Sequence, residues 1–387
     1  MPHLKYIPQK IKASLINISL FIKWLMYFFI FRFLPINKNV AVFESFWGRS
    51  YDCNPLALSD YLAKNSELKI VWSVNKGTCI DLNVSKHVIF VYRMSWRYFY
   101  YLGVSKFFIS NVNFPSFLLK RKKSTHIQTQ HGTPLKLMGE DVKNIKVSNL
   151  RKRSERWDYV ISSNSYSTQV WKKCFPYHYT IVESGYPRND LLVRHRGDHT
   201  LRIEILRRHA MTYIANRTVI LYMPTWREYE FDYSRYILEL INNIPDNIVI
   251  LYKKHHLDSS VESIISDKLI FVDQEFKVNE LYLISDLLIT DYSSAMFDYA
   301  NLQRPIVLFI PDYSRYAESR GIYFDITKCP PGEVTFSIEQ LSYSIMNKKY
   351  QSTTASEKLA HFHKLFCEYE RGDACMRIYN DLFSTHE

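Results

Sequence analysis

The stretch Leu281-Tyr-Leu-Ile-Ser-Asp-Leu-Leu-Ile-Thr-Asp-Tyr-Ser-Ser-Ala-Met-Phe-Asp298 decides the fold of this chain. Its pattern predicts a short helix, then a buried strand over residues 287–290, then a polar turn that opens a second helix. In an open α/β sheet, ligands bind at the carboxyl ends of the strands, which is where this turn would lie. The turn would present hydroxyl groups, helix N–H groups and the positive end of a helix dipole to one point.

Such a turn suits a phosphate or pyrophosphate, held with the help of Thr290, Asp291, Ser293 and Ser294. The alternative is an ordinary helix N-cap, because Asp and Ser are preferred at that position. The stretch alone favours the cap, and only the ends of the other strands favour a ligand site.

Composition limits the class of protein. At 387 residues, with 47% hydrophobic and 23% charged residues, the chain is globular and long enough for two domains. A net charge of +12 indicates an anionic partner: nucleic acid, anionic lipid or a phosphorylated substrate. Nucleic acid is disfavoured because no signature of a nucleic-acid-binding module is present. Six scattered cysteines favour reduced thiols in the cytosol and predict no zinc site.

The N-terminus predicts a helix from Pro8 to about Leu34, where Pro35 stops it. Lys23 lies in its middle and would be costly inside a bilayer, whereas Lys5, Lys10 and Lys12, nearer the N-terminus, would meet anionic headgroups. We therefore expect residues 1–36 to form a membrane-associating helix in the cytoplasmic interface, rather than a core helix or a span. This predicts a peripheral or monotopic protein at the cytoplasmic face of the cell membrane.

From residue 40 onward, short apolar strands alternate with helical stretches, which predicts parallel sheets built by βαβ crossovers. A polar segment at 193–200 separates two such halves. The prediction is an α/β protein with two Rossmann-like domains facing a central cleft, at 37–200 and 201–355, and C-terminal helices at 356–387 packing back across them. The predicted strands are 40–43, 68–74, 88–91, 106–110, 125–129, 157–162, 179–182, 219–223, 248–252, 269–272, 287–290 and 306–309.

Basic side chains follow several of these strands. His131 comes directly after the strand at 125–129, and a histidine in a cleft can take a proton from an alcohol at pH 7. Arg227 offers a planar fork to phosphate oxygens, while Lys253 and His255 offer point donors. We expect the ends of the second-half strands to converge on one anionic ligand site. There is no Walker A, GxGxxG, GxSxG or Asp-x-Asp metal motif, so no tightly bound metal is expected.

Several segments of the chain form a recognisable set, in a fixed order over about residues 40–380. The main ones are Phe43-Glu-Ser-Phe-Trp-Gly48, Gln130-His-Gly-Thr-Pro-Leu-Lys136, Gly185-Tyr-Pro-Arg-Asn-Asp190, Met223-Pro-Thr-Trp-Arg227 and Thr290-Asp-Tyr-Ser-Ser294. In these segments the chain resembles the CDP-glycerol glycerophosphotransferase family of teichoic acid and capsule synthesis. The family usually has His-Pro where this chain has His255-His256, and His255 is taken as the equivalent residue.

The resemblance implies a GT-B fold that transfers a polyol phosphate from a CDP-activated donor to a polyprenyl-diphosphate-linked glycan, with release of CMP and no cofactor. It implies His131 and His255 as the catalytic histidines, with His131 as the base. Donor and phosphate contacts would come from Arg227, Lys253, Thr290, Asp291, Ser293, Ser294 and Asp298. Acceptor-side residues would be Glu44, Gly132, Thr133 and Lys136.

Several alternatives stay open at this point. CDP-ribitol is the alternative donor. A polymerase is the alternative to a primase, and the length of a single catalytic module favours the primase. A CMP-sialic-acid-using transferase would also place His and Ser/Ser motifs around CMP. From another class of protein, a non-catalytic module that binds anionic polymers would fit the charge.

Overall fold

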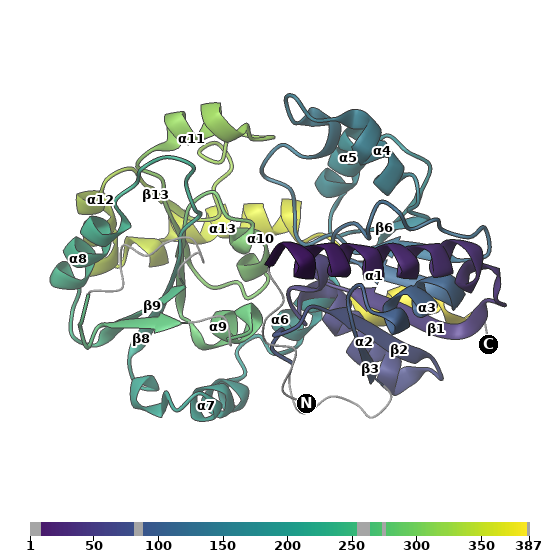
Figure 1. The fold of residues 1–387 in the computed structure, drawn as a ribbon. Helices are drawn as coiled ribbons and strands as arrows, with labels where there is room; N and C mark the ends of the chain where they lie inside the picture. The colour runs from purple at the N-terminus through teal and green to yellow at the C-terminus, as the bar shows by residue number, and fades with distance from the viewer. Residues whose placement is uncertain (1–8, 81–87, 254–263, 273–275, 385–387) are drawn as a thin grey trace.

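A computed structural model describes residues 9–80, 88–253, 264–272 and 276–384 of the chain. It shows two lobes, one from each half of the chain, and each lobe is built on its own β-sheet with helices around it (Figure 1). The predicted pair of α/β halves is confirmed.

The sheet of the first half has, in the described residues, seven strands in the order β3-β2-β1-β4-β5-β6-β7, and every neighbouring pair is parallel. Most of their residues are buried, because helices cover both faces of a parallel sheet. The strands are β1 (Asn37–Glu44), β2 (Lys69–Val74), β3 (Val88–Tyr92), β4 (Ser105–Ser110), β5 (Thr125–Gln128), β6 (Tyr159–Ser162) and β7 (Thr180–Glu183).

The sheet of the second half is also parallel, with the order β10-β9-β8-β11-β12-β13 among the described residues. The short last strand was missed by sequence reasoning because three residues that include a glutamate form no apolar run. The strands are β8 (Thr218–Met223), β9 (Ile248–Lys253), β10 (Leu269–Val272), β11 (Leu287–Thr290), β12 (Ile306–Phe309) and β13 (Glu333–Thr335).

Helices connect these strands and cover the sheets. Shorter 3-10 helices lie at Phe31–Phe33, Phe46–Gly48, Gly139–Asp141, Pro187–Asn189, Thr212–Ile214 and Lys349–Gln351. The α-helices are α1 (Gln9–Phe29), α2 (Cys53–Asn65), α3 (Trp96–Val104), α4 (Val147–Ser154), α5 (Ser165–Cys174), α6 (Asp190–Arg194), α7 (His199–Arg208), α8 (Tyr233–Asn243), α9 (Val278–Ile284), α10 (Ala295–Ala300), α11 (Tyr313–Arg320), α12 (Ile338–Met346), α13 (Thr353–Phe366) and α14 (Ala374–Leu382).

Strand order brings the polar segments of the second half to one edge. The stretch quoted first forms α9, β11 and α10, as predicted, and β11 lies in the sheet between β8 and β12. Thr290 at the end of β11 is in register with Met223 at the end of β8, and β9 follows on the other side of β8. The carboxyl ends of β8, β9 and β11 therefore meet, as the sequence indicated.

The C-terminal helices cross back over both halves (Figure 1). Helix α13 packs against α10 of the second half and α5 of the first, and α14 packs against α2. Phe362 and Phe366 of α13 belong to a hydrophobic core that also contains Leu135 and Leu192 from the first half. The two lobes thus share buried apolar contacts.

The N-terminal helix is shorter than predicted, ending at Phe29 instead of about Leu34. The chain turns there and places the backbone of Phe31 against Gly103 of α3, where an added Cβ would lie 2.6 Å from Phe31. Tyr27 is fully buried against α3, and its hydroxyl donates to the carbonyl of Leu119 at 3.3 Å. Within the described residues, no helix combines the length and the apolar character that crossing a membrane requires.

Candidate active site

His131 lies in a loop just beyond the carboxyl end of β5. Gln130 and Gly132 on either side of it have positive φ angles of 53° and 140°, which turn the loop out of the sheet. The histidine Nδ1 lies 3.1 Å from the carbonyl oxygen of Asn111. Because a carbonyl oxygen only accepts hydrogen bonds, Nδ1 carries the proton, and Nε2 of the neutral ring keeps its lone pair.

Burial of His131 favours its neutral form. Burial lowers the pKa of the imidazole, and the guanidinium of Arg188 lowers it further, while the bond to Asn111 and the carboxylate of Asp298 act in the opposite direction. A neutral histidine with an available Nε2 has the protonation state that a general base needs at pH 7.

The turn after β11 is fixed mainly by two side chains that point toward β8. Thr290 donates its hydroxyl to the carbonyl of Met223 at 2.8 Å. The carboxylate of Asp291 accepts the backbone N–H of Thr225 at 2.9 and 3.0 Å. Ser293 and Ser294 are partly exposed, and Ser293 accepts the N–H of Ala295 at 3.2 Å. Thr290 and Asp291 therefore hold the 223–227 loop, and the two serines face outward.

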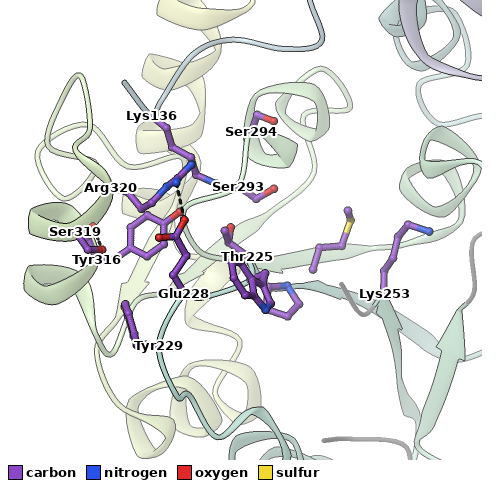
Figure 2. A pocket seen from close by; sticks show the side chains of 13 residues that line it. Lys136, Thr225, Glu228, Tyr229, Lys253, Ser293, Ser294, Tyr316, Ser319 and Arg320 are labelled. Carbon is purple, nitrogen blue, oxygen red and sulfur yellow. Dashed lines mark hydrogen bonds and ion pairs between the residues drawn. The ribbon is translucent and has the colours of Figure 1, made fainter. Parts of the chain in front are cut away.

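Ser293 and Ser294 line two cavities. The larger, of about 470 Å³, is lined by side chains of the second half together with Lys136 of the first. Figure 2 shows Lys136 and Arg320 beside Tyr316, with Ser293 and Thr225 nearby and Lys253 farther along. Three cations and several hydroxyls around one cavity suit a diphosphate.

The smaller cavity, of about 220 Å³, contains His131. Met223, Ser293 and Ser294 line both cavities, so the two cavities adjoin at the serine turn. An added Cβ on Gly132 would lie 3.3 Å from the hydroxyl oxygen of Ser294, which shows how closely the two halves approach here.

Arg227 is not placed as the sequence suggested for a phosphate ligand. Its side chain is almost fully buried and pairs with Asp291 and with both carboxylate oxygens of Asp312, at 2.9 and 3.0 Å. The rings of Phe231 and Tyr292 lie 4.5 and 4.9 Å from the guanidinium carbon. Among the described residues that line the two cavities, Arg227 is absent.

Lys136 lies in the larger cavity with the donor-side candidates, although the sequence placed it on the acceptor side. The reason is a crossing of the chain, because the backbone of Lys136 pairs with Ile322 of the second half. Its ammonium lies 5.7 Å from the centre of the Tyr316 ring. Burial lowers the pKa of Lys136 to about 8, while Asp291 acts to raise it.

Two other predicted acceptor-side residues, Glu44 and Thr133, make side-chain contacts within the first half. Glu44 is fully buried, accepts the hydroxyl of Ser73 at 2.8 Å and pairs with Arg93 at 3.3 Å. Burial raises the pKa of Glu44, whereas Arg93 acts to lower it. Thr133 lies 3.2 Å from the hydroxyl of Ser163.

His255 lies outside the described residues, as does its neighbour at position 256. In the part of the chain that is described, no group of three or more His, Cys, Asp or Glu side chains is arranged to hold a metal ion.

Arg188 is a candidate site residue that sequence reasoning missed. It lines the cavity of His131 and forms an ion pair with Asp298 of the second half at 2.6 Å. The segment that contains it, residues 185–190, matched the family pattern, but no contact partner is visible from the sequence.

Two parallel α/β domains with a cavity lined from both sides define a transferase with a GT-B-like fold. The family model described as CDP-Glycerol:Poly(glycerophosphate) glycerophosphotransferase matches residues 26–384. The chain belongs to this family.

Relatives and solved structures support the assignment over nearly the whole chain. A Staphylococcus aureus protein named teichoic acid glycerol-phosphate transferase is 35% identical over 371 residues, which cover 90% of this chain and 93% of that protein. A Bacillus spizizenii teichoic acid poly(glycerol phosphate) polymerase is 32% identical, with the same coverage. A structure of the wall teichoic acid polymerase TagF has a TM-score of 0.86 at 29% identity and covers 98% of this chain and 96% of that one.

Proteins named for ribitol phosphate match less of the chain. Three teichoic acid ribitol-phosphate polymerases align over 52–54% of it, at 26–28% identity.

Proposed function

We propose that this transferase moves glycerol phosphate from CDP-glycerol to a hydroxyl of a polyprenyl-diphosphate-linked glycan in teichoic acid or capsule synthesis, and releases CMP. The observation that carries the proposal is the meeting of His131 from the first half with Ser293 and Ser294 from the second at adjoining cavities. One cavity offers a base and the other offers cations and hydroxyls, which matches the two sides of a phosphoryl-type transfer.

The proposed reaction is a substitution at phosphorus. The acceptor oxygen forms a bond to the phosphorus that carries glycerol, and the bond from this phosphorus to the bridging oxygen of CMP breaks. Nε2 of His131 takes the proton of the acceptor hydroxyl. Lys136, Lys253 and Arg320 line the cavity where the diphosphate would lie, and their charges would stabilise the leaving CMP. His255 keeps the donor-side role that the resemblance implies, and the proposal assigns no resident cofactor.

Glycerol is the donor alcohol that the comparisons favour. The two glycerol-phosphate relatives cover 90% of the chain, whereas the ribitol-phosphate polymerases cover little more than half. One of the similar TagF structures was soaked with CDPG. Asp298, proposed from the resemblance as a nucleotide contact, lies in the same cavity as His131.

The proposal also places the protein on the cytoplasmic face of the membrane, where a lipid-linked acceptor is found. Helix α1 lies lengthwise along the first half (Figure 1), and several of its apolar side chains point to solvent, among them Ile18, Phe21 and Phe29. A row of exposed aliphatic and aromatic side chains on a helix surface is suited to the boundary between headgroups and acyl chains.

The decisive test incubates the purified full chain with CDP-glycerol or CDP-ribitol and a disaccharide diphospholipid, and follows CMP release and product mass. We expect CMP from CDP-glycerol and one or more glycerol-phosphate increments on the acceptor. A single increment identifies a primase and a ladder identifies a polymerase. CMP from CDP-ribitol alone would contradict the assigned donor, and donor binding without turnover would support a binding module.

The role of His131 has its own test. His131→Ala removes the base and should lower turnover by about 10²–10⁴-fold, while CDP-glycerol binding measured by calorimetry stays within a few-fold. Loss of donor binding in this variant would instead make His131 a donor ligand or a structural residue.

A further inference from the structure

Arg188 reaches from the first half to the second through one guanidinium. Nη1 donates to the carbonyl oxygen of His131 at 2.9 Å and lies 3.0 Å from the sulfur of Cys53. Nη2 donates to Oδ2 of Asp298 at 2.6 Å. The two side chains are only 13% and 8% exposed, so this ion pair is largely shielded from water.

Asp298 is held by the first half on its other oxygen as well. Asn189, next to Arg188, donates its amide to Oδ1 at 3.2 Å, and the same amide donates to Glu370 at 2.9 Å. Because Asp298 lies on α10, directly after the serine turn, these bonds connect the turn of the second half to the histidine loop of the first.

The space between the histidine loop of the first half and the serine turn of the second half is small. A Cβ on Gly132 would lie 3.1 Å from Nη2 of Arg188 and 3.3 Å from the hydroxyl oxygen of Ser294. The backbone carbonyl of Arg188 also accepts the amide of Asn279 from α9 at 2.5 Å. The guanidinium is therefore fixed from both halves at the point where the proposed acceptor and donor sides meet.

We propose that Arg188 is a positioning residue of the transfer, holding the carbonyl of His131 and the carboxylate of Asp298 together so that the base faces the serine turn. This inference rests on the proposed function. Charge-assisted hydrogen bonds have a defined geometry, and a displacement of about 1 Å at a reacting group can cost about 10²-fold in rate. The contact of Asp298 would then be with Arg188, in place of the nucleotide.

The ion pair also sets the electrostatic environment of His131, and its two members act in opposite directions. Arg188 lowers the pKa of His131, and Asp298 raises it. In the part of the chain that the structure describes, the other titratable groups that line the same cavity are Asp52 and Cys53 at the start of α2 and Tyr282 on α9. Removing the charge of Arg188 should raise the histidine pKa, whereas removing the charge of Asp298 should lower it.

The experiment compares Arg188→Met, Arg188→Lys, Asp298→Asn and the double variant Arg188→Met/Asp298→Asn in steady-state kinetics over pH 5–9. We expect Arg188→Met to lower kcat by about 10–100-fold with the KM for CDP-glycerol within a few-fold, and Arg188→Lys to recover part of the loss. The acidic limb of the pH profile should move to higher pH in Arg188→Met and to lower pH in Asp298→Asn. The double variant should lose less than the product of the two single losses, because the residues act as a pair.

A matched control is the ion pair of Arg202 with Asp286 at the opposite, amino-terminal end of the second sheet, where the Arg202 side chain is 12% exposed. Arg202→Met removes a similarly shielded arginine without touching either cavity. It should leave kcat and the pH profile unchanged, even if the protein loses folding stability.

The proposal is wrong if Arg188→Met leaves the acidic limb in place, or if only the KM for CDP-glycerol rises, since the second result would make the pair a donor site. A nuclear magnetic resonance titration of the His131 imidazole, assigned by its loss in His131→Asn, requires no turnover. Opposite pKa shifts in Arg188→Met and Asp298→Asn would support the arrangement even if CDP-glycerol proved not to be the donor. Absent or equal shifts would overturn it.

Discussion

An arginine after a strand can bind a phosphate or form a buried structural ion pair, and the sequence does not distinguish these two roles for Arg227. The Met223–Arg227 segment follows a strand of the second half, which is where an arginine for phosphate is expected. In the structure, its guanidinium is enclosed by aromatic rings and satisfied by Asp291 and Asp312, so it ties the 223–227 loop to the serine turn. Among the described residues, the cations that line the larger cavity are Lys136, Lys253 and Arg320.

Arg227→Met should therefore lower the free energy of unfolding more than it weakens CDP-glycerol binding. Breaking a buried ion pair from one side costs about 3–5 kcal/mol, because the remaining buried carboxylates lose the positive charge that compensates them. Urea unfolding should show a loss of this size. Arg320→Met is the matched control, because its pair with Glu228 is largely exposed and should change stability by less than about 1 kcal/mol. Normal stability of Arg227→Met with lost CDP-glycerol binding would make Arg227 a donor ligand.

The lowered pKa of Lys136 predicts how the binding of the donor depends on pH. Its pKa is lowered to about 8 by burial, so the ammonium is charged below that pH and neutral above it. Arg320 and Arg227 act in the same direction as burial, and Asp291 opposes them. The Tyr316 ring lies beside the ammonium, and the diphosphate diester of CDP-glycerol keeps its charge across this range.

The affinity for CDP-glycerol should then decrease above pH 8, by at most about tenfold per pH unit for one titrating group. Lys136→Arg keeps the charge and should extend tight binding to higher pH, while Lys136→Met should bind weakly and without this dependence. Calorimetry at pH 7–9.5 measures all three proteins. An unchanged alkaline decrease in Lys136→Arg would exclude Lys136 as its source.

At the scale of elements, helix α1 divides its surface between two environments. Leu20, Trp24 and Tyr27 pack toward α3 and the first sheet, and Tyr27 is bonded to Leu119. Phe21 and Phe29 are 58% and 64% exposed. The apolar sequence that predicted an interfacial helix therefore contains both a core face and an outward face, and removal of the whole helix would damage the core.

Point substitutions on the outward face are the sharper test of membrane binding. Phe21→Gln/Phe29→Gln should abolish pelleting with anionic phospholipid vesicles while the fold is kept, since each buried Phe contributes about 1.5–3 kcal/mol. Tyr213→Gln is the control, because Tyr213 is similarly exposed, at 65%, but lies in the second half. Vesicle sedimentation that is equal for wild type and the double variant would argue against the interfacial helix.

At the scale of the whole molecule, the candidate site is built from residues of both halves. His131 comes from the first half, the serine turn from the second, and Arg188 and Asp298 join them across the boundary. The shared core around Leu135 and Leu192 and the crossing helices α13 and α14 hold the halves in this relation. Substitutions at the boundary between the halves should therefore lower kcat more than they weaken donor binding, as expected for Arg188.

The sequence by itself determined the twelve strands that were predicted, the turn around Ser293 and Ser294, and the loop of His131, because apolar periodicity and turn residues act locally. It also indicated that the ends of β8, β9 and β11 would converge, since parallel strands share one carboxyl edge. Only the tertiary structure decided that Arg227 and Glu44 are buried, that Lys136 crosses to the second half, and that Arg188 meets Asp298. Those outcomes depend on which distant charges and rings become neighbours, and no local pattern contains that information.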